Sequence, residues 1–441
     1  MLTKTRVTTI VNLAFPISIA LGSTLMMSVI DLAMVGRLGS AAIAAVGLSV
    51  FCNTLVLALV AGIAPAVQGL VARRRGENSS QQTSLPFNAG ALLALVVGAP
   101  LTVGAFFLSP YLFSAISSDP AVTRIGIPFL RTLYLGIIAV GVGNAFKGYW
   151  AGMEKPKVYM LIVLFMNCLN AGLNYVLIFG HLGVPAMGAT GAAVGTVVSL
   201  YAGMIVSFAV SRSYFRNEGF LVGRPSRASM VQIFKIGLPA TMQEFFFSAG
   251  YVVFFWMIGM VGTAELAATN VLVRVAMVLT LLAMSLGMAS ATLVSKTVGE
   301  GDLAGAAQWG WDTGKVGVIG ITLLGLPLFF FPGPFLSIFL SDPHALSIAI
   351  LPMRLLAATT GIGSLIYIFA YTLYSVGDGK RVIMVSLGTQ WLLFLPGVWI
   401  VGPYLRCSLL QIWFVQMAYG VLATVLITSI WADGKWKSIR I

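Results

Sequence analysis

The chain has 441 residues, of which 59% are hydrophobic and only 9% are charged, and its formal net charge is +13. Soluble globular proteins usually carry about a quarter charged residues, so this composition cannot cover a water-facing surface. Largely apolar stretches of about 18 residues or more, the length that a helix needs to cross the bilayer, recur along the chain. The length of these stretches also makes a membrane β-barrel a poor alternative, because barrel strands are short and alternate polar with apolar residues.

The hydropathy pattern predicts an all-α polytopic membrane protein with twelve transmembrane helices. The first apolar stretch is too long for the core of a cleavable signal peptide, so we take it as the first span. In chain order the predicted spans are 8–35, 42–71, 86–109, 125–152, 158–180, 189–211, 231–259, 265–294, 308–331, 349–376, 382–402 and 409–432.

Basic residues are distributed unequally over the predicted loops. Most fall on one side of the membrane, among them the run Arg73–Arg75, whereas only Arg37, Arg124 and Arg406 lie in loops on the other side. Because Lys and Arg are enriched in cytoplasmic loops, this distribution places both termini in the cytoplasm, as expected for a multi-pass bacterial inner-membrane protein. The positive charge therefore orients the protein and does not indicate a nucleic-acid partner.

The two halves of the sequence resemble each other. With an offset of 223 residues, VGRLGSAAIAAVGLSV (35–50) lies over IGMVGTAELAATNVLV (258–273), and Pro16 lies over Pro239. The repeat predicts an N-terminal six-helix lobe at 1–211, a cytoplasmic linker at 212–230 and a C-terminal six-helix lobe at 231–441. Two copies with six helices each enter the membrane in the same direction, an arrangement typical of transporters.

One acid and several polar residues lie at a similar depth in the first lobe. Asp31 precedes the end of the first helix at Gly36 by five residues, or roughly 8 Å at ~1.5 Å per residue. On the fifth helix Asn170 and Asn174 share one face, and Thr196 lies at a comparable depth on the sixth. Oxygen atoms at one level suit Na⁺, and a buried carboxylate among hydrogen-bonding neighbours equally suits a proton. The alternatives are an acid that caps a helix and amides that tie helices together.

Other residues are candidates for substrate contact or bending. The candidate substrate-binding residues are Met27, Ser28, Gln243, Glu244 and Asn270. Glu244 could equally be a structural acid paired with a buried base such as Arg274. Pro16 removes a backbone hydrogen bond from the first helix and favours a kink, which predicts a hinge there.

These motifs in this order resemble the MATE family (multidrug and toxic compound extrusion). The resemblance rests on the early proline, IDLAMVGRLGSAAIAAVG, LNAGLNYVLIFG, GATGAAVGT, GLPATMQE and LYSVGDGK. It implies a V-shaped, two-lobed, cation-coupled antiporter that exports amphipathic, often cationic drugs by alternating access, without a cofactor and as a monomer.

Within the family the chain is more similar to the DinF-like subgroup. In that group the acid matching Asp31 is the coupling residue, Asn170, Asn174 and Thr196 match its polar partners, and Pro16 matches the position of the proposed bend. The NorM-like subgroup uses acids on the seventh and tenth helices instead, but the tenth predicted span, 349–376, has none. Some DinF-like members carry a carboxylate where this chain has Asn174. Losing that charge weakens a Na⁺ site more than it weakens proton transport, so H⁺ is favoured over Na⁺.

Two further functions fit the sequence less well than the exporter. A flippase for lipid-linked sugars would be expected to line its cavity with bases, and the basic residues here lie near helix ends. A membrane enzyme or scaffold is a weaker alternative, because no metal-ligand spacing, nucleophile–base set or phosphate-binding loop is present. The three cysteines and two histidines are too scattered to suggest a metal site or a disulfide framework.

Overall fold

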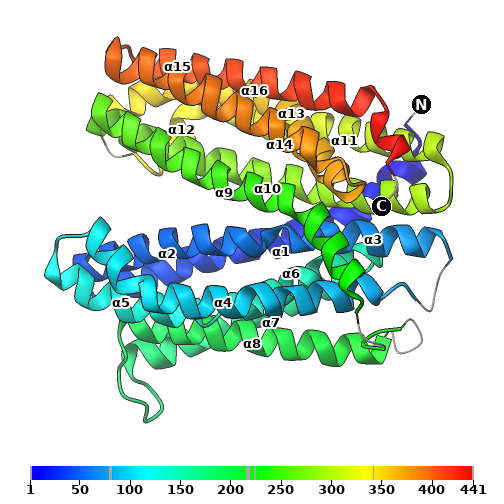
Figure 1. Ribbon diagram of the computed structural model, residues 1–441. Helices are drawn as coiled ribbons and strands as arrows, with labels where there is room; N and C mark the ends of the chain where they lie inside the picture. The colour runs from blue at the N-terminus through cyan, green and yellow to red at the C-terminus, as the bar shows by residue number, and fades with distance from the viewer. Residues whose placement is uncertain (1, 79–81, 215–218, 223–224, 341, 440–441) are drawn as a thin grey trace. The chain divides into compact units, whose positions relative to one another are not determined.

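The computed structural model describes residues 2–78, 82–214, 219–222, 225–340 and 342–439 (Figure 1). Throughout these ranges the backbone is helix, turn or loop, without a strand, which confirms the all-α prediction. The helices are α1 (Lys4–Gly36), α2 (Ser40–Ala61), α3 (Ile63–Gly76), α4 (Leu85–Ile116), α5 (Pro120–Tyr134), α6 (Ile137–Gly152), α7 (Pro156–Phe179), α8 (Ala189–Tyr214), α9 (Arg227–Val261), α10 (Thr263–Gly299), α11 (Leu303–Phe330), α12 (Pro332–Leu336), α13 (Pro343–Ser375), α14 (Gly379–Leu387), the π-helix η3 (Gly388–Phe394), α15 (Leu395–Trp399), the π-helix η4 (Ile400–Tyr404), α16 (Leu409–Ala432) and the 3₁₀-helix η5 (Lys435–Ser438).

The number of spans agrees with the prediction from hydropathy. Within the described residues, 11 helices are long and apolar enough to cross a membrane, with α2–α3 and α14–η4 each counted as one. The pair α5–α6, bent by 44°, passes the same test when its two helices are taken together and makes a twelfth when counted as one span. The predicted span 125–152 therefore corresponds to a bent helix pair, and the predicted span 42–71 is interrupted at Gly62.

The chain divides into two compact units, and the division does not follow the order of the sequence. One unit is Pro16–Thr241, and the other combines Met1–Phe15 with Met242–Ile441. The units change inside α1 and inside α9, next to Pro16 and two residues after Pro239. Each repeat thus contributes the first part of its first helix to the other unit, whereas the repeat in the sequence predicts a boundary at the linker 212–230.

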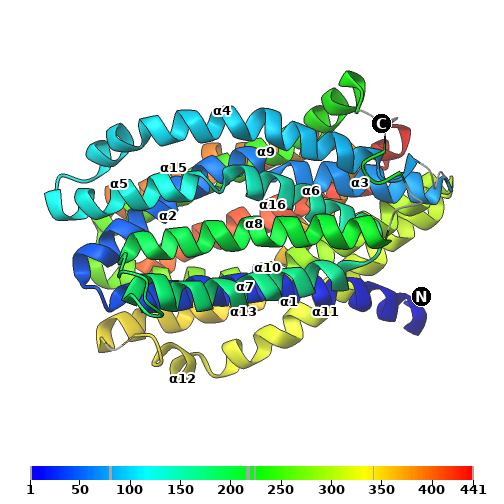
Figure 2. The same ribbon diagram turned by 90° about the horizontal axis from the view of Figure 1, so that it is seen from below.

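In the unit of residues 16–241, α7 and α8 run side by side (Figures 1 and 2). The linker 212–230 is also anchored in this unit, as far as the described residues show. Phe220 is 5% exposed and stacks on Phe87 with 5.1 Å between ring centroids, and the Asn88 side chain accepts a hydrogen bond from Leu221 N. Both ends of the predicted linker are helical, because α8 continues to Tyr214 and α9 begins at Arg227.

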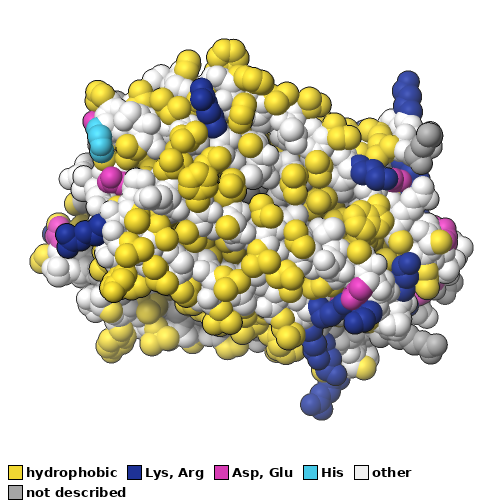
Figure 3. Space-filling view, turned by 90° about the horizontal axis from the view of Figure 1, so that it is seen from above, with side chains coloured by type: hydrophobic (Ala, Val, Ile, Leu, Met, Phe, Trp, Pro, Cys, Tyr) yellow, Lys and Arg dark blue, Asp and Glu magenta, His cyan; other side chains and the backbone are white. Residues whose placement is uncertain are grey.

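In the other unit, α13 packs against α10, α11 and α16. The π-helix η3 presents Gln390 to α9, where its amide donates to the Phe247 carbonyl at 3.2 Å. The described chain begins and ends at the same end of this unit, as an even number of spans requires (Figure 1). On the face in Figure 3, hydrophobic side chains cover most of the middle, and most Lys and Arg side chains gather toward one end. This is the distribution expected for a surface in contact with lipid.

Candidate functional site

The four residues predicted to form a polar cluster do meet in the unit of residues 16–241. Asn174 Nδ2 donates to Asp31 Oδ1 at 2.6 Å. The Asn170 amide, oriented so that its nitrogen faces acceptors, donates to Asp31 Oδ1 at 3.2 Å and accepts from Thr196 N at 3.0 Å. Asp31, Asn170, Asn174 and Thr196 come from α1, α7 and α8, which place them at one level.

The side chains that form these hydrogen bonds are buried or half-buried, so water can replace few of their contacts. Asn170 and Asn174 are 5% and 0% exposed, and Asp31 is half-buried. Among the described residues Asp31 forms no ion pair, so neutral amide donors alone compensate its charge. Hydrogen bonds to an ionised acceptor are shorter and about twice as strong as those between neutral groups. Two amide donors therefore converge on one oxygen of a half-buried carboxyl group.

Asp31 lies at the wall of a cavity of about 350 Å³. Met27 and Ser28, two of the predicted substrate-binding residues, also line it. Among the described residues around this cavity, Asp31 carries the only charge. The polar members of the lining are Thr24, Ser28, Asp31, Asn144, Tyr159, Asn167, Asn170, Thr196, Ser199 and Ser207.

Some polar residues of this lining, Asn167 among them, are not among the predicted site residues. Asn167, which donates to Ser23 Oγ at 2.9 Å, lies three residues before Asn170 and seven before Asn174. Spacings of three and four place these residues on one helix face, and the same spacing links Thr24, Met27 or Ser28, and Asp31 on α1. This helical periodicity is the signal in the sequence that could have identified them.

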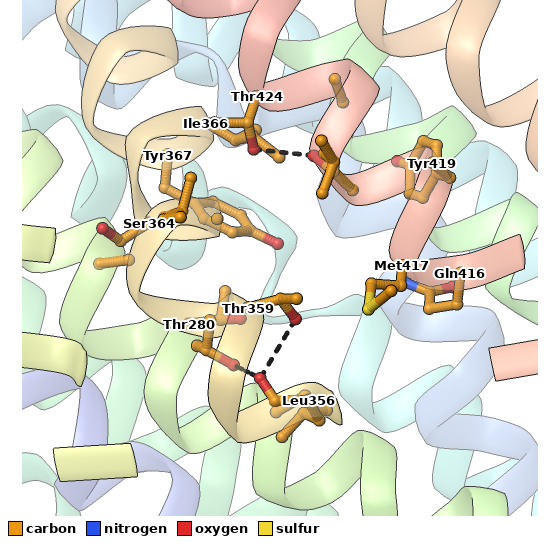
Figure 4. A pocket seen from close by; sticks show the side chains of 18 of the residues that line it. Thr280, Leu356, Thr359, Ser364, Ile366, Tyr367, Gln416, Met417, Tyr419 and Thr424 are labelled. Carbon is orange, nitrogen blue, oxygen red and sulfur yellow. Dashed lines mark hydrogen bonds between the residues drawn. The ribbon is translucent and has the colours of Figure 1, made fainter. Parts of the chain in front are cut away.

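A second cavity, of about 200 Å³, lies in the unit that contains residues 242–441. Thr280, Thr359, Ser364 and Tyr367 line one side, and α16 supplies Gln416, Met417 and Tyr419 (Figure 4). No Asp, Glu, Lys, Arg or His belongs to its described lining. This cavity is therefore aromatic and hydroxyl-rich, and it lacks the acid that characterises the first.

The remaining predicted substrate residues differ in position. Gln243 lines the second cavity, and its buried Oε1 has no hydrogen-bond partner among the described residues. Glu244, beside it, has an exposed side chain and lines neither cavity. Asn270 also lines neither, and its amide donates to the Leu266 carbonyl of its own helix at 2.9 Å.

Gly195 allows Asn174 to occupy its position beside Asp31. A methyl group on Gly195 would lie 2.2 Å from Asn174 Oδ1, so Gly195→Ala must displace this fully buried amide from Asp31. We expect this variant to lower ion-driven dye transport in vesicles severalfold. Gly172→Ala is the matched control, because Gly172 lies on α7 with nothing within 4 Å of the added methyl. Equal transport by the two variants would contradict a role for the Asn174–Asp31 contact.

The family model described as MatE matches the chain twice, over residues 16–176 and 239–400. Both matches begin at the prolines that the internal repeat aligns, so the duplication is confirmed independently of the structure. Together they cover well over half of the chain.

Similar proteins include two described as "Probable multidrug resistance protein NorM". The one from Thermotoga maritima is 26% identical over 418 residues, covering 92% of this chain and 88% of the relative. The one from Bacillus cereus is 28% identical over 340 residues, with 75% and 74% covered.

Solved structures share the fold at low identity. An outward-facing multidrug resistance MATE transporter of the MOP superfamily gives a TM-score of 0.88 at 18% identity, covering 98% of this chain and 97% of the other. A MOP superfamily transporter from Pyrococcus furiosus gives 0.84 with the same identity and coverage. The eukaryotic MATE transporter AtDTX14 gives 0.85 at 17% identity, covering 98% and 96%.

Proposed function

The chain belongs to the MatE family, and on that basis we propose that it is a cation-coupled antiporter that exports amphipathic, often cationic small molecules. Membership in the family makes it a multi-span membrane transporter of small molecules and not an enzyme. The relatives named above are multidrug resistance proteins, which supports drugs or toxins as the exported class. The coupling ion, the coupling residues and the direction of transport are the parts that we propose.

The single observation that carries the coupling proposal is the Asp31 carboxylate, the only charged group at the wall of its cavity in the described chain. Intramembrane acids are costly and are usually retained for ion or substrate transport. The cavity of the other unit has no acid in its described lining, and α13, the tenth span, contains none in its sequence. We therefore propose that coupling takes place in the unit of residues 16–241.

The orientation of the Asn174 amide supports H⁺ over Na⁺ as the coupling ion. Asn174 directs its Nδ2 to Asp31 Oδ1, whereas a Na⁺ ion beside Asp31 would need oxygen atoms facing it. A proton needs no such rearrangement. We propose that a proton entering from outside neutralises Asp31, weakens these charge-assisted hydrogen bonds and changes the shape of the cavity, with α1 bending at Pro16.

The membrane orientation and the subgroup of the chain are two further parts of the proposal. We propose that both termini face the cytoplasm of a bacterial cell, in agreement with the positively charged loops and with chain ends at one end of their unit (Figure 1). We also propose the DinF-like subgroup, although the relatives named above are called NorM. The acid on α1 and the absence of an acid on α13 support this choice.

A direct test of this proposal is the transport of a fluorescent cationic dye in everted vesicles, energised by a proton gradient or a sodium gradient. We expect the proton gradient alone to drive dye accumulation. Accumulation that requires sodium would assign the oxygen atoms of Asp31, Asn170, Asn174 and Thr196 to a metal site. Transport under neither gradient would contradict the exporter and favour the lipid-linked sugar flippase.

A further inference from the structure

The helix that carries Asp31 belongs to both compact units. Its residues up to Phe15 cluster with Met242–Ile441, and from Pro16 onward it belongs to the other unit. The backbone nevertheless runs as one continuous helix from Lys4 to Gly36. Any change of the helix angle at Pro16 therefore moves the part of α1 that carries Asp31 relative to the residues that pack against Lys4–Phe15.

Apolar contacts hold the first segment of α1 firmly in its unit. Ile10, Leu13 and Ala14 are 0%, 9% and 4% exposed and form one cluster with Ala289 and Leu293 of α10. Burying side chains of this size stabilises a contact by about 1.5–3 kcal/mol for each large residue. A segment packed in this way is part of the unit's core.

A partly buried ion pair, in which the Arg6 side chain is 21% exposed, adds to this packing. Arg6 Nη1 donates to Asp312 Oδ2 at 2.6 Å, and the Asp312 side chain is only 2% exposed. Lys315 Nζ is 3.6 Å from the other carboxylate oxygen but is itself 56% exposed. The Arg6 guanidinium also lies over the Trp309 ring, 4.4 Å from its centroid. Without Arg6 the Asp312 carboxylate would keep, among the described residues, only the more exposed Lys315 as a basic partner, so this contact is costly to open.

We propose that Arg6 and Asp312 are positioning residues that keep Lys4–Phe15 anchored throughout the transport cycle, so that α1 acts as a lever with its pivot at Pro16. Asp31 lies fifteen residues beyond the pivot, which is roughly 22 Å along the helix. A small change of angle at Pro16 is therefore a large displacement at Asp31, provided that the first segment does not move. This inference rests on the proposed function, because it assigns the anchor to ion-coupled transport.

The first test uses covalent replacement of the ion pair. Arg6→Cys/Asp312→Cys is made in a background without the native cysteines, Cys52, Cys168 and Cys407. Without a linker we expect gradient-driven dye transport to fall about tenfold, because the Arg6–Asp312 contact and the contact of Arg6 with the Trp309 ring are both lost. A reducible bifunctional thiol reagent that joins the two cysteines should restore dye transport. Reductive cleavage of this linker should lower dye transport again. Transport that is blocked by the linker would overturn the proposal, because the segment would then have to detach. Normal transport without the linker would also overturn it.

A matched pair separates anchoring from general stability. Arg381 and Asp433 form another Arg–Asp contact within the same unit, at 2.5 Å, without involving α1, and Arg381 also pairs with Asp378. For Arg381→Cys/Asp433→Cys we expect the ratio of gradient-driven to downhill dye movement to stay at the background value, linked or unlinked. A merely structural loss lowers the amount of folded protein and leaves this ratio unchanged, whereas loss of the lever lowers the ratio itself. The variant Arg6→Lys keeps the positive charge. Its ratio of gradient-driven to downhill dye movement should therefore lie between the ratios of the parent protein and the unlinked Arg6→Cys/Asp312→Cys variant.

A readout that does not depend on transport distinguishes failure of the anchor from failure of the proposed function. The single cysteine of Ile10→Cys, at a position that is 0% exposed, should stay protected from a maleimide with and without dye and gradient. With Arg6→Gln its alkylation should become about tenfold faster or more. Ala306→Cys, also at a 0% exposed position in this unit, should react equally slowly in both backgrounds. Alkylation of the Ile10→Cys thiol during the cycle, or protection that survives Arg6→Gln, would overturn the anchor even if no dye is transported.

Discussion

Replacing Asp31 with Asn is expected to reduce proton-driven dye accumulation to the level of vesicles without a gradient. The amide has nearly the shape of the carboxylate, and its oxygen can still accept from Asn174 Nδ2, so folding and membrane insertion should be preserved. The variant cannot take up and release a proton, however, and its cavity has no other charged group in the described lining. The measurement is dye accumulation in everted vesicles at matched amounts of folded protein.

Glu244→Gln is the matched control for this variant, because Glu244 is the acid of α9, the first helix of the other repeat, and lines neither cavity. We expect it to retain proton-driven accumulation. Normal accumulation by Asp31→Asn would exclude coupling through Asp31. If Glu244→Gln abolishes proton-driven dye accumulation and Asp31→Asn does not, the coupling residue lies on α9 instead of α1.

Adding a methyl group at Gly62 is expected to destabilise the unit of residues 16–241 by about 1–3 kcal/mol or more. Gly62 separates α2 from α3, and its N–H donates to Thr241 Oγ1 at 3.2 Å. A Cβ atom there would lie 2.0 Å from the Gly237 carbonyl oxygen, and a Cβ atom on Gly237 would lie 2.6 Å from the Gly62 carbonyl oxygen. Both obstacles are backbone atoms, so the first part of α9 would have to move away.

Thermal unfolding of the purified protein in detergent tests this prediction. Gly62→Ala should unfold at a lower temperature than the parent protein, and Gly237→Ala should behave in the same way. Gly47→Ala is the control, because Gly47 lies in α2 with nothing within 4 Å of the added atom. If Gly62→Ala and Gly47→Ala unfold at the same temperature, the close approach of α9 to the α2–α3 break does not contribute to stability.

Local patterns were sufficient to predict the helices and the cluster around Asp31. Hydropathy over about 20 residues determines whether a helix can span the bilayer, and it predicted the number of spans. The helical rise fixed the depth of Asp31 relative to Gly36, and helical periodicity placed Asn170 and Asn174 on one face. Because all spans cross the same bilayer, residues at equal depth on adjacent helices can contact each other, as Asp31, Asn170 and Asn174 do.

Contacts between distant parts of the chain required the tertiary structure. Arg6 and Asp312 are separated by 306 positions, and no periodicity in the sequence pairs them. Hydropathy does not reveal the break at Gly62 or the π-helical turns of η3, since both depend on what packs against them. The exchange of helix segments between units at Pro16 and near Pro239 likewise depends on packing.

The amino-acid sequence determines which residues form helices and how deep they lie in the membrane, because both depend on short stretches of sequence. It also determines the internal repeat, which is found by comparing the sequence with itself. Which helix segments share a core is decided by the shape of side chains that lie far apart in the chain. Ile10 reads as an ordinary apolar residue of the first span, yet it belongs to the core formed with Ala289 and Leu293. The lever inferred for α1 therefore became visible only when the partners of its first fifteen residues were known.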